Sequence, residues 1–328
     1  VRPLVERAVL DFVDSERGRA LAQTPTLTSD HLIRTKALPA WVDDPAWDDA
    51  AKLREQFVAV IGAYARDYDA CFERNRASLP PGVERADPAP RVVLLPGLGA
   101  LCAGEDVRGA GVAADITRQT LAVKAQIAAM GTYEGLPEGD LFEMEYYTLQ
   151  QAKLRPTALR LAHEVAIVTG AAGAIGAGIA RGLLREGCHV AVTDLAGERL
   201  DSLVAELRAE FGERATGVAL DVGDPASVAA GFAQVCAHFG GVDLVVINAG
   251  LAHVATLDQL ELEAFRRLER VNVEGTLHLL KEAARSFAVQ RTGGDVVLVS
   301  TKNVFAPGAG FGAYSATKAA AHQLARRG

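Results

Sequence analysis

Cysteine, clustered histidine and long hydrophobic runs are all scarce in this sequence. The cysteines stand singly at Cys71, Cys102, Cys188 and Cys236, without the spacing of metal ligands or of a disulfide framework. No apolar run approaches the roughly 18 residues that a membrane-spanning helix needs, and the first residues do not resemble a signal peptide. These absences predict reduced, mostly buried thiols, no membrane partner and a cytoplasmic protein.

An excess of positive charge is also missing. The 34 basic and 41 acidic residues give a formal net charge of −7, and the charges are spread without long runs. Nucleic acids and anionic membrane surfaces select basic patches, so neither is an expected partner. With 49% hydrophobic residues in 328, the chain can bury two cores. A small-molecule substrate is the expected partner.

We expect two domains, at residues 1–160 and 161–328. The first begins with helical patterns and Pro-punctuated loops, and RVVLLPGLGALCAG predicts a buried strand and a tight turn. A long amphipathic helix is expected from about Asp106 to Met130, followed by a short linker before Glu164. The start at Val1 rather than Met and the end within an expected helix predict a piece of a longer protein.

From Glu164 onward, β-branched apolar runs alternate with helical patterns. Helices are expected near 174–187, 196–211, 225–239 and 259–289, and strands at EVAIVT, HVAVTD, TGVALD, VDLVVIN and DVVLVS. Strands that are apolar on both faces belong to parallel sheets covered by helices. The predicted fold is therefore α/β, a doubly wound Rossmann-type sheet that binds ligands at the carboxyl ends of its strands.

The segment TGAAGAIG, Thr169 to Gly176, follows a predicted strand and opens a predicted helix. This context is typical of a phosphate-binding turn, because glycines admit a close approach of the backbone and a helix N-terminus offers free N–H groups. The alternative is a glycine-rich turn that only connects the two elements.

Asp194 stands at the end of the next predicted strand, where a carboxylate can accept hydrogen bonds from an adenosine ribose. A phosphate on that ribose would be repelled, and the glycine turn contains no Lys or Arg to bind it. NAD is therefore the expected cofactor rather than NADP, although Arg199 lies nearby. Alternatively, Asp194 is the N-cap of the following helix.

Together with these motifs, Asp221, the run Asn248–Ala249–Gly250, Asn272 and the pair Tyr314/Lys318 follow in order. The ordered set resembles the short-chain dehydrogenase/reductase family. This resemblance implies a nicotinamide-dependent oxidoreductase that forms homo-oligomers through its Rossmann-domain helices. It assigns the cofactor contacts to Gly170, Gly173, Ile175, Gly176, Asp194, Asp221, Val222, Asn248, Ala249, Gly250, Tyr314 and Lys318.

Tyr314 and Lys318 are four residues apart, so they share one face of a helix. An ammonium group close to a phenol favours the phenolate, which a base near neutral pH requires. The resemblance implies that Tyr314 takes the proton from a substrate hydroxyl, that Lys318 holds the nicotinamide ribose and that Asn272 positions a water. The alternative is an exposed helical turn.

The sequence departs from the family at two positions. Thr301 stands where the family has its serine, preceded by Ser300; because neighbouring strand residues face opposite ways, we expect Thr301 to face the substrate and Ser300 to pack within the sheet. In the glycine turn, Ala174 occupies the usual middle glycine position and a glycine stands one place earlier, at Gly173. We expect the turn still to bind a dinucleotide.

The first half resembles the region that joins aldolase to dehydrogenase in bifunctional rhamnulose-1-phosphate aldolase/alcohol (lactaldehyde) dehydrogenases, notably at LTSDHLIRTKALP and PRVVLLPGLGALCAG. The resemblance implies a partial class II aldolase-like segment and a role in deoxy-sugar catabolism with lactaldehyde as substrate. His31 is the only histidine before Leu161 and Leu98 replaces an expected ligand, so no metal site is predicted. The alternative functions are a non-catalytic NAD-binding module and a zinc-dependent sugar-phosphate aldolase.

Overall fold

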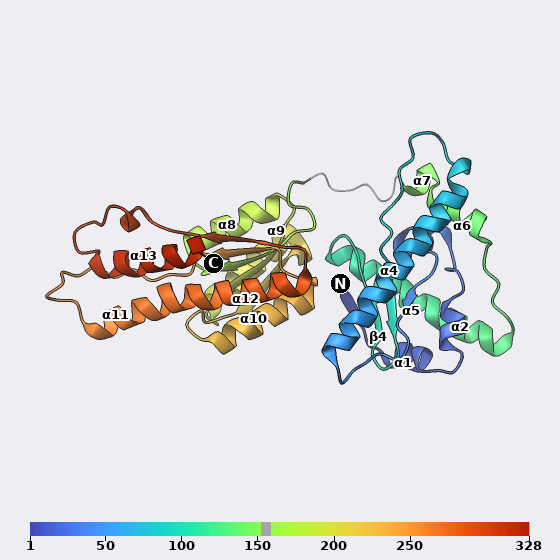
Figure 1. Ribbon diagram of the computed structural model, residues 1–328, viewed down its shortest axis with the longest axis horizontal. Coiled ribbons are helices and arrows are strands. Elements are labelled where there is room, and N and C mark those ends of the chain that lie inside the picture. Colours follow the sequence, from blue (N-terminus) through green and yellow to red (C-terminus); the bar gives the residue numbers. More distant parts are fainter. Residues whose placement is uncertain (152–158, 328) are drawn as a thin grey trace. The chain divides into compact units, whose positions relative to one another are not determined.

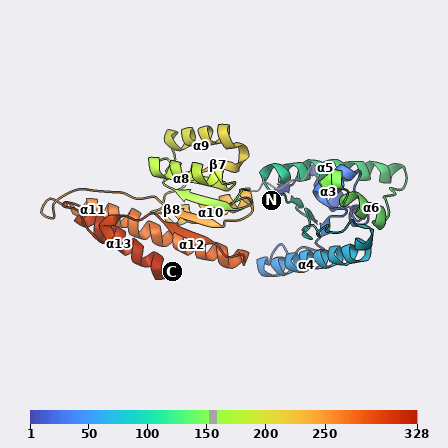
Figure 2. The same cartoon turned by 90° about the horizontal axis from the view of Figure 1, so that it is seen from above.

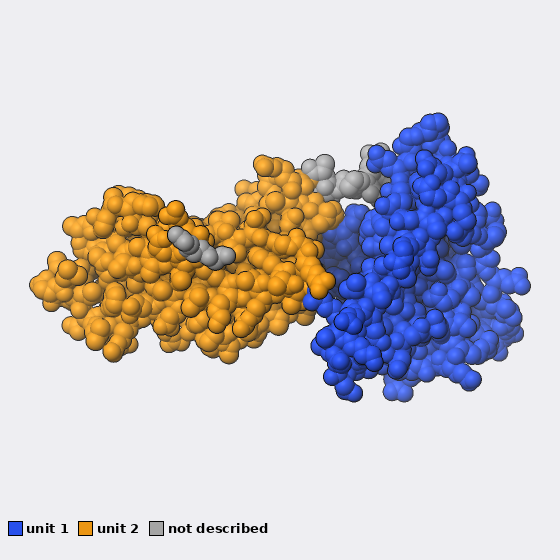
Figure 3. Space-filling model, viewed as in Figure 1, with its two compact units in different colours: residues 1–156 blue, residues 157–328 orange. Residues whose placement is uncertain are grey.

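The computed structural model describes residues 1–151 and 159–327. The chain forms two compact units, residues 1–156 and 157–328 (Figure 3). The linker expected before Glu164 falls largely on residues outside the described ranges. The predicted division between residues 160 and 161 stays a prediction.

Unit 1 contains a four-stranded sheet with the strand order β1–β4–β3–β2. The sheet mixes antiparallel pairs (β1 with β4, β4 with β3) and one parallel pair (β3 with β2). The predicted strand is β3, and the predicted tight turn leads from it into β4, with positive φ at Gly97 in the turn and at Gly99, the first residue of β4. The strands are β1 (Arg2–Leu4), β2 (Ala40–Trp41), β3 (Val92–Leu95) and β4 (Gly99–Cys102).

Two long helices pack on opposite faces of this sheet (Figure 2). Val92 and Leu94 join a core with α5, while Val93 and Leu95 pack against α4, as the alternation of a strand requires. Asp106 caps α5 through the backbone N–H of Gly109, close to the predicted helix start. The helices are α1 (Arg7–Val13), α2 (Gly18–Ala22), α3 (Ser29–Thr35), α4 (Ala50–Asn75), α5 (Val107–Met130), α6 (Glu138–Glu145), α7 (Thr148–Gln151) and a 3₁₀ turn at Arg76–Ser78.

Unit 2 contains a five-stranded, wholly parallel sheet with the order β7–β6–β5–β8–β9. The order reverses between β5 and β8, which confirms the doubly wound fold. All residues of β5 are buried, whereas Val296 and Val297 of the edge strand β9 are exposed. The strands are β5 (Val165–Thr169), β6 (His189–Asp194), β7 (Ala215–Ala219), β8 (Leu244–Ile247) and β9 (Asp295–Leu298).

Helices cover both faces of this sheet, with α8 and α9 on one side and α10 and α12 on the other (Figures 1 and 2). The helix expected near 259–289 is confirmed as a continuous helical segment from Leu262 to Gln290, and it contains a π-helical turn at Glu269–Glu274. Short 3₁₀ turns lie at Gly212–Arg214 and Lys302–Val304. The helices are α8 (Ala174–Arg185), α9 (Glu198–Phe211), α10 (Pro225–Phe239), α11 (Leu262–Leu268), α12 (Gly275–Gln290) and α13 (Gly312–Arg327).

Candidate active site

The glycine turn connects β5 to α8 at the carboxyl end of the central strand. Gly170 has a φ of 62°, and a Cβ atom there would lie 2.8 Å from the Cα of Ala249. A Cβ atom at Gly176 would lie 2.5 Å from the carbonyl oxygen of Gly170. Both positions therefore require glycine, and α8 starts tightly packed against the turn.

The two departures within this turn lie at the start of α8. Gly173 is the N-cap with an extended backbone, and Ala174 is the first helical residue. Ala174 and Ile175 are exposed, so their side chains leave the core untouched. The first N–H groups of a helix have no partner within the helix and are suited to bind an anion.

Thr169 and Asn248 lock the turn onto the neighbouring strand. The Thr169 hydroxyl accepts from the backbone N–H groups of Asn248 (3.0 Å) and Ala249 (3.1 Å). In return, Asn248 Nδ2 donates to the carbonyl oxygens of Thr169 (2.9 Å) and Gly170 (3.1 Å). Sequence reasoning missed Thr169 as a site residue; its signal is a polar side chain that ends a fully buried strand.

Asp194 ends β6 beside the glycine turn. Its Oδ2 accepts from the backbone N–H of Ala172 at 2.9 Å, and its Oδ1 accepts from that of Leu195 at 2.8 Å. The N-cap alternative is wrong, because the N-cap of α9 is Gly197. Arg199 Nη2 donates to the carbonyl oxygen of Ala172 at 3.2 Å, so a cation also lies next to this turn.

Asp221 and Val222 follow β7 at the same edge of the sheet. Asp221 Oδ1 accepts from the backbone N–H of Gly223 at 2.8 Å, and Oδ2 lies 3.6 Å from Arg270 Nη2. Val222 is buried, and a Cβ atom at Gly275 would lie 2.9 Å from it. These contacts hold the end of β7 against the turn of helix that contains Asn272.

Asn272 lies in the π-helical turn with 1% of its surface exposed. Its Oδ1 accepts from the backbone N–H of Leu251 at 2.8 Å, and its Nδ2 donates to the carbonyl oxygen of Leu251 at 2.9 Å and to the hydroxyl of Thr317 at 3.0 Å. The side-chain amide thus joins the loop after β8 to α13. Sequence reasoning missed Thr317, although this residue lies between Tyr314 and Lys318 in the predicted motif.

Tyr314 and Lys318 both lie on α13, as their spacing predicts. Lys318 is buried and its Nζ donates to the carbonyl oxygen of Val299 at 2.8 Å; burial lowers the pKa of this amine. A Cβ atom at Gly250 would lie 3.2 Å from Asn272 Oδ1 and 3.9 Å from Lys318 Nζ. The structure therefore brings Gly250, Asn272 and Lys318 together at the carboxyl end of β8.

The expectation for Ser300 is wrong. Strand β9 ends at Leu298, so Ser300 lies beyond the sheet and is exposed rather than packed within it. Thr301 is half-buried and is the N-cap of the 3₁₀ turn, where its hydroxyl accepts from the backbone N–H of Asn303 at 3.3 Å. Ser300 and Thr301 therefore differ in burial although both lie beyond the end of β9, so the alternation of strand residues does not apply to them.

His31 and Leu98 lie in unit 1, at the positions where the sequence raised the question of a metal ligand. His31 lies in the first turn of α3, where Thr28 caps its backbone N–H, and Leu98 packs beside the core of unit 1. Among residues 1–151 and 159–327, no three His, Cys, Asp or Glu side chains are grouped to hold a metal. Within the same ranges, no helix combines the length and hydropathy of a membrane span.

These residues fit a nicotinamide dinucleotide. The exposed N-terminal turn of α8 suits a pyrophosphate, and the carboxylate of Asp194 keeps lone pairs beyond its two backbone bonds for a ribose diol. An ammonium has three donors, and only one of those of Lys318 is directed at Val299 within the described chain. The fold and this donor set define a dinucleotide-binding α/β protein.

Comparison with known proteins gives the family. Residues 164–327 match the family model described as short chain dehydrogenase, and residues 4–154 match the one described as aldolase class II, second domain. The chain belongs to the short-chain dehydrogenase family through its second unit, and carries an aldolase class II-like domain before it.

Three relatives show how far the similarity extends. The oxidoreductase YuxG of Bacillus subtilis is 34% identical over 324 residues, which is 97% of this chain and 46% of that protein. A sorbitol dehydrogenase of Cereibacter sphaeroides is 34% identical over 51% of this chain and 63% of its own length. A D-threitol dehydrogenase of Mycolicibacterium smegmatis is 36% identical over 44% of this chain and 54% of its own length. The chain spans about half the length of these relatives.

Proposed function

We propose that unit 2 is an NAD-dependent dehydrogenase that interconverts a small sugar-derived alcohol and its carbonyl compound. Lactaldehyde, as part of deoxy-sugar catabolism, is the substrate that the resemblance of the first half implies. Relatives named for sorbitol and D-threitol support the wider class of polyols. The observation that carries the proposal is the convergence of Gly250, Asn272 and Lys318 beside the glycine turn.

In this proposal the nicotinamide, when bound, accepts or supplies the hydride. Tyr314 takes the proton from the substrate hydroxyl during oxidation and returns it during reduction. Lys318 lies one helical turn after Tyr314 on α13, and its proposed part is to hold the nicotinamide ribose. The hydroxyl of Thr301 orients the substrate oxygen by donating or accepting a hydrogen bond.

Asn272 is proposed to be a positioning residue for this reaction. All the donors and acceptors of its amide that the structure describes are directed at Leu251 and Thr317, and Thr276 Oγ1 donates to its backbone carbonyl oxygen at 2.7 Å. Its proposed part is therefore to fix the loop after β8 against α13. The water that the resemblance assigns to Asn272 stays a prediction.

The preference for NAD rests on the charge of Asp194. A carboxylate fits the diol of an adenosine ribose and repels a phosphate in its place. Arg199 lies beside the same turn and is the residue through which NADP would be accepted. A cytoplasmic location and pairing of copies through the helices with Asn272 and Tyr314 stay predictions from the sequence.

The test is a substrate panel with both cofactors. Oxidation of sorbitol, D-threitol and propane-1,2-diol and reduction of lactaldehyde are followed by nicotinamide absorbance with NAD(H) and with NADP(H). The proposal expects turnover of at least one of these compounds, with a higher kcat/KM for NAD(H). NADH binding without turnover of any compound would favour the non-catalytic alternative instead.

A further inference from the structure

Unit 1 contains a cavity that the dehydrogenase site does not use. Its volume is about 390 Å³, within the range of small-molecule sites, which span roughly 300–1,000 Å³. The segment after α3 forms one wall, and α4 and α6 form the others. Ala37, Tyr64, Asp67, Tyr68, Glu138 and Glu145 are among the residues that line it.

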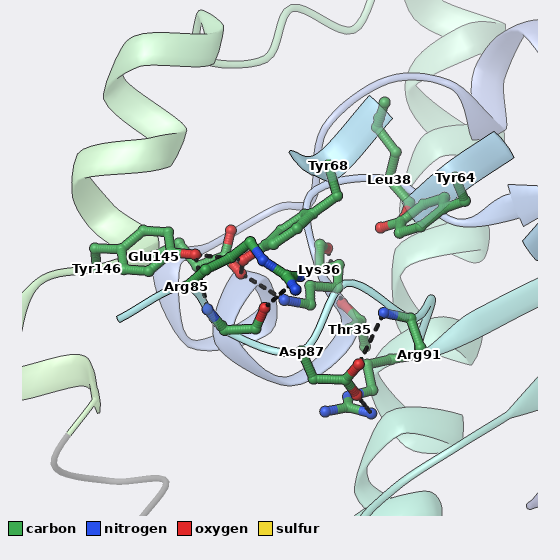
Figure 4. A network of polar contacts seen from close by, with 12 residues as sticks. Thr35, Lys36, Leu38, Tyr64, Tyr68, Arg85, Asp87, Arg91, Glu145 and Tyr146 are labelled. Carbon is green, nitrogen blue, oxygen red and sulfur yellow. Dashed lines mark hydrogen bonds and ion pairs between the residues drawn. The ribbon is translucent and has the colours of Figure 1, made fainter. Parts of the chain in front are cut away.

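A buried ion pair lies at the wall of this cavity (Figure 4). Lys36 Nζ is 2.9 Å from Glu145 Oε1, with 7% and 10% of the two side chains exposed. Tyr68 donates to the same carboxylate oxygen at 2.8 Å, and the ammonium lies 3.9 Å from the centre of the Tyr68 ring. The hydroxyl of Tyr146, 2.8 Å from that of Tyr68, extends the network to the backbone N–H of Ala86.

The backbone at Lys36 is strained. Its φ of 65° and ψ of 172° fall in a region that side chains other than glycine rarely adopt, at a cost of about 1–3 kcal/mol. Glycine would be free of this cost, yet a lysine stands here. The strained residue directs its amine at Glu145, and Tyr64 fixes the following segment by donating to the carbonyl oxygen of Leu38 at 2.9 Å.

The ion pair by itself is weak evidence of a stabilising role. A buried ion pair often contributes no more to stability than well-packed apolar residues of similar volume, because both charges lose their hydration. Burial lowers the pKa of Lys36, which reports the same cost. A strained backbone, a desolvated ion pair and a ligand-sized cavity coincide, and strain of this kind concentrates at functional sites.

The chemistry of the walls selects the ligand. The carboxylates of Asp67, Glu138 and Glu145 border the cavity, while the cations near them are already paired: Arg74 with Glu138 through two bonds, and Lys36 with Glu145. Each of these two ion pairs is neutral overall, so the exposed carboxylate of Asp67 leaves the wall with one excess negative charge, which disfavours anions.

Aromatic faces complete the site. Tyr64 and Tyr68 line the cavity together with Phe72 and Phe142, which provide apolar surface for the carbon skeleton of a ligand. We propose that this cavity binds a neutral polyhydroxylated compound, whose hydroxyls donate to the carboxylates and whose C–H faces lie on the rings. A phosphorylated sugar does not fit this charge pattern. The proposal is independent of the dehydrogenase function of unit 2.

The test is ligand-detected saturation-transfer NMR and calorimetry on the 328-residue chain without nucleotide. The probes are sorbitol, galactitol, D-threitol and glucose, with sorbitol 6-phosphate as the anionic comparison and putrescine as the cationic one. We expect at least one neutral probe to bind, and sorbitol 6-phosphate to bind at least about tenfold more weakly than sorbitol. Binding of none of the neutral probes, or a preference for the phosphate or for putrescine, would overturn the proposal.

Variants locate the binding. Ala37→Phe places a ring in the cavity and is expected to weaken neutral-probe binding at least about tenfold, with NADH binding unchanged. Ala125→Phe, at an exposed position of α5, is the matched control and keeps full affinity. Where Ala37→Phe does not fold, Tyr68→Phe, which removes one hydroxyl from the wall, is expected to weaken binding severalfold. Undiminished affinity in the cavity variant that folds would refute the site.

The strain is tested separately. The double variant Lys36→Gly/Glu145→Gln removes the strained side chain and both charges together. We expect it to lose the neutral probe while its melting temperature stays within a few degrees of the wild type, since the network is present for binding. A double variant that binds the probe as tightly as the wild type would show that the ion pair has no part in the site.

Discussion

The amide nitrogen of Asn272 donates a hydrogen bond to the hydroxyl of Thr317, 3.0 Å away. The same hydroxyl donates to the carbonyl oxygen of Tyr314 at 2.9 Å, so the amide and the first turn of α13 are joined through one side chain. The π-helical turn allows this contact by projecting Asn272 inward. The position of Tyr314 therefore depends on a residue in a different helix.

Asn272→Ala is expected to reduce the free energy of unfolding by about 3 kcal/mol, because it leaves buried partners on Leu251 and Thr317 without hydrogen bonds. Urea unfolding measures this loss. Asn75→Ala is the control: that half-buried amide bonds Cys71 and Glu138 near the surface of unit 1, and about 1 kcal/mol is expected. Equal losses in the two variants would contradict the bracing role of Asn272.

Substitutions distinguish the roles of Thr301 and Ser300 in catalysis. Thr301→Ala is expected to lower kcat/KM about 100-fold, by removing a hydrogen-bonding group at the substrate oxygen, and Thr301→Ser to retain most of the activity. Steady-state kinetics on the best substrate of the panel measure both. Ser300→Ala, at an exposed position beyond β9, is expected to have no effect. A large effect at Ser300 would reverse the assignment.

Asp194→Ser is expected to raise the ratio of kcat/KM for NADP over that for NAD by about tenfold or more, since the charge that repels a ribose phosphate is removed. The ratio is the measurement, because the substitution also takes an acceptor from the backbone N–H of Ala172. Adding Arg199→Ala to this variant is expected to cancel part of the gain. An unchanged ratio would show that Asp194 does not contact the cofactor.

Lys124 in unit 1 makes folding stability depend on pH. Its side chain is 2% exposed and its Nζ donates to the carbonyl oxygen of Thr24 at 2.6 Å; burial lowers its pKa from 10.5 to about 8. Above pH 8 the native state has released this proton while the unfolded chain keeps it, so rising pH favours the native state.

Lys124→Met lacks this titration. The free energy of unfolding of the wild type, minus that of the variant, is therefore expected to increase between about pH 8 and pH 10.5 and to be constant below that window. Urea unfolding of both proteins across this range gives the difference, in which the other titrating groups cancel. A difference that falls with rising pH would contradict the desolvation of Lys124.

Local patterns were sufficient for most of unit 2. The buried run of β5 and the glycine at 170, which requires a positive φ, follow from residue type alone. The spacing of four residues likewise predicts that Tyr314 and Lys318 lie on one helix. The π-helical turn was not predictable, because it contains Asn272, whose side chain bonds parts of the chain that are distant in sequence.

Unit 1 was less predictable because its features depend on tertiary contacts. Strands β1 and β2 are too short for a periodic pattern and are defined by pairing with β4 and β3. Lys36 and Glu145 are 109 residues apart in sequence, so no local motif marks their ion pair. The expectation that Ser300 packs within the sheet is wrong because the apolar run DVVLV gives no signal that β9 ends at Leu298.

Tyr314→Phe tests the central claim most directly. The variant keeps the ring, its packing near Phe311 and the helix, and removes only the hydroxyl that is assigned to proton transfer. NADH binding, followed by fluorescence, is expected to stay within about twofold of the wild type, while kcat for the best substrate falls at least about 100-fold. Unchanged hydride transfer in a variant that binds NADH normally would contradict the account.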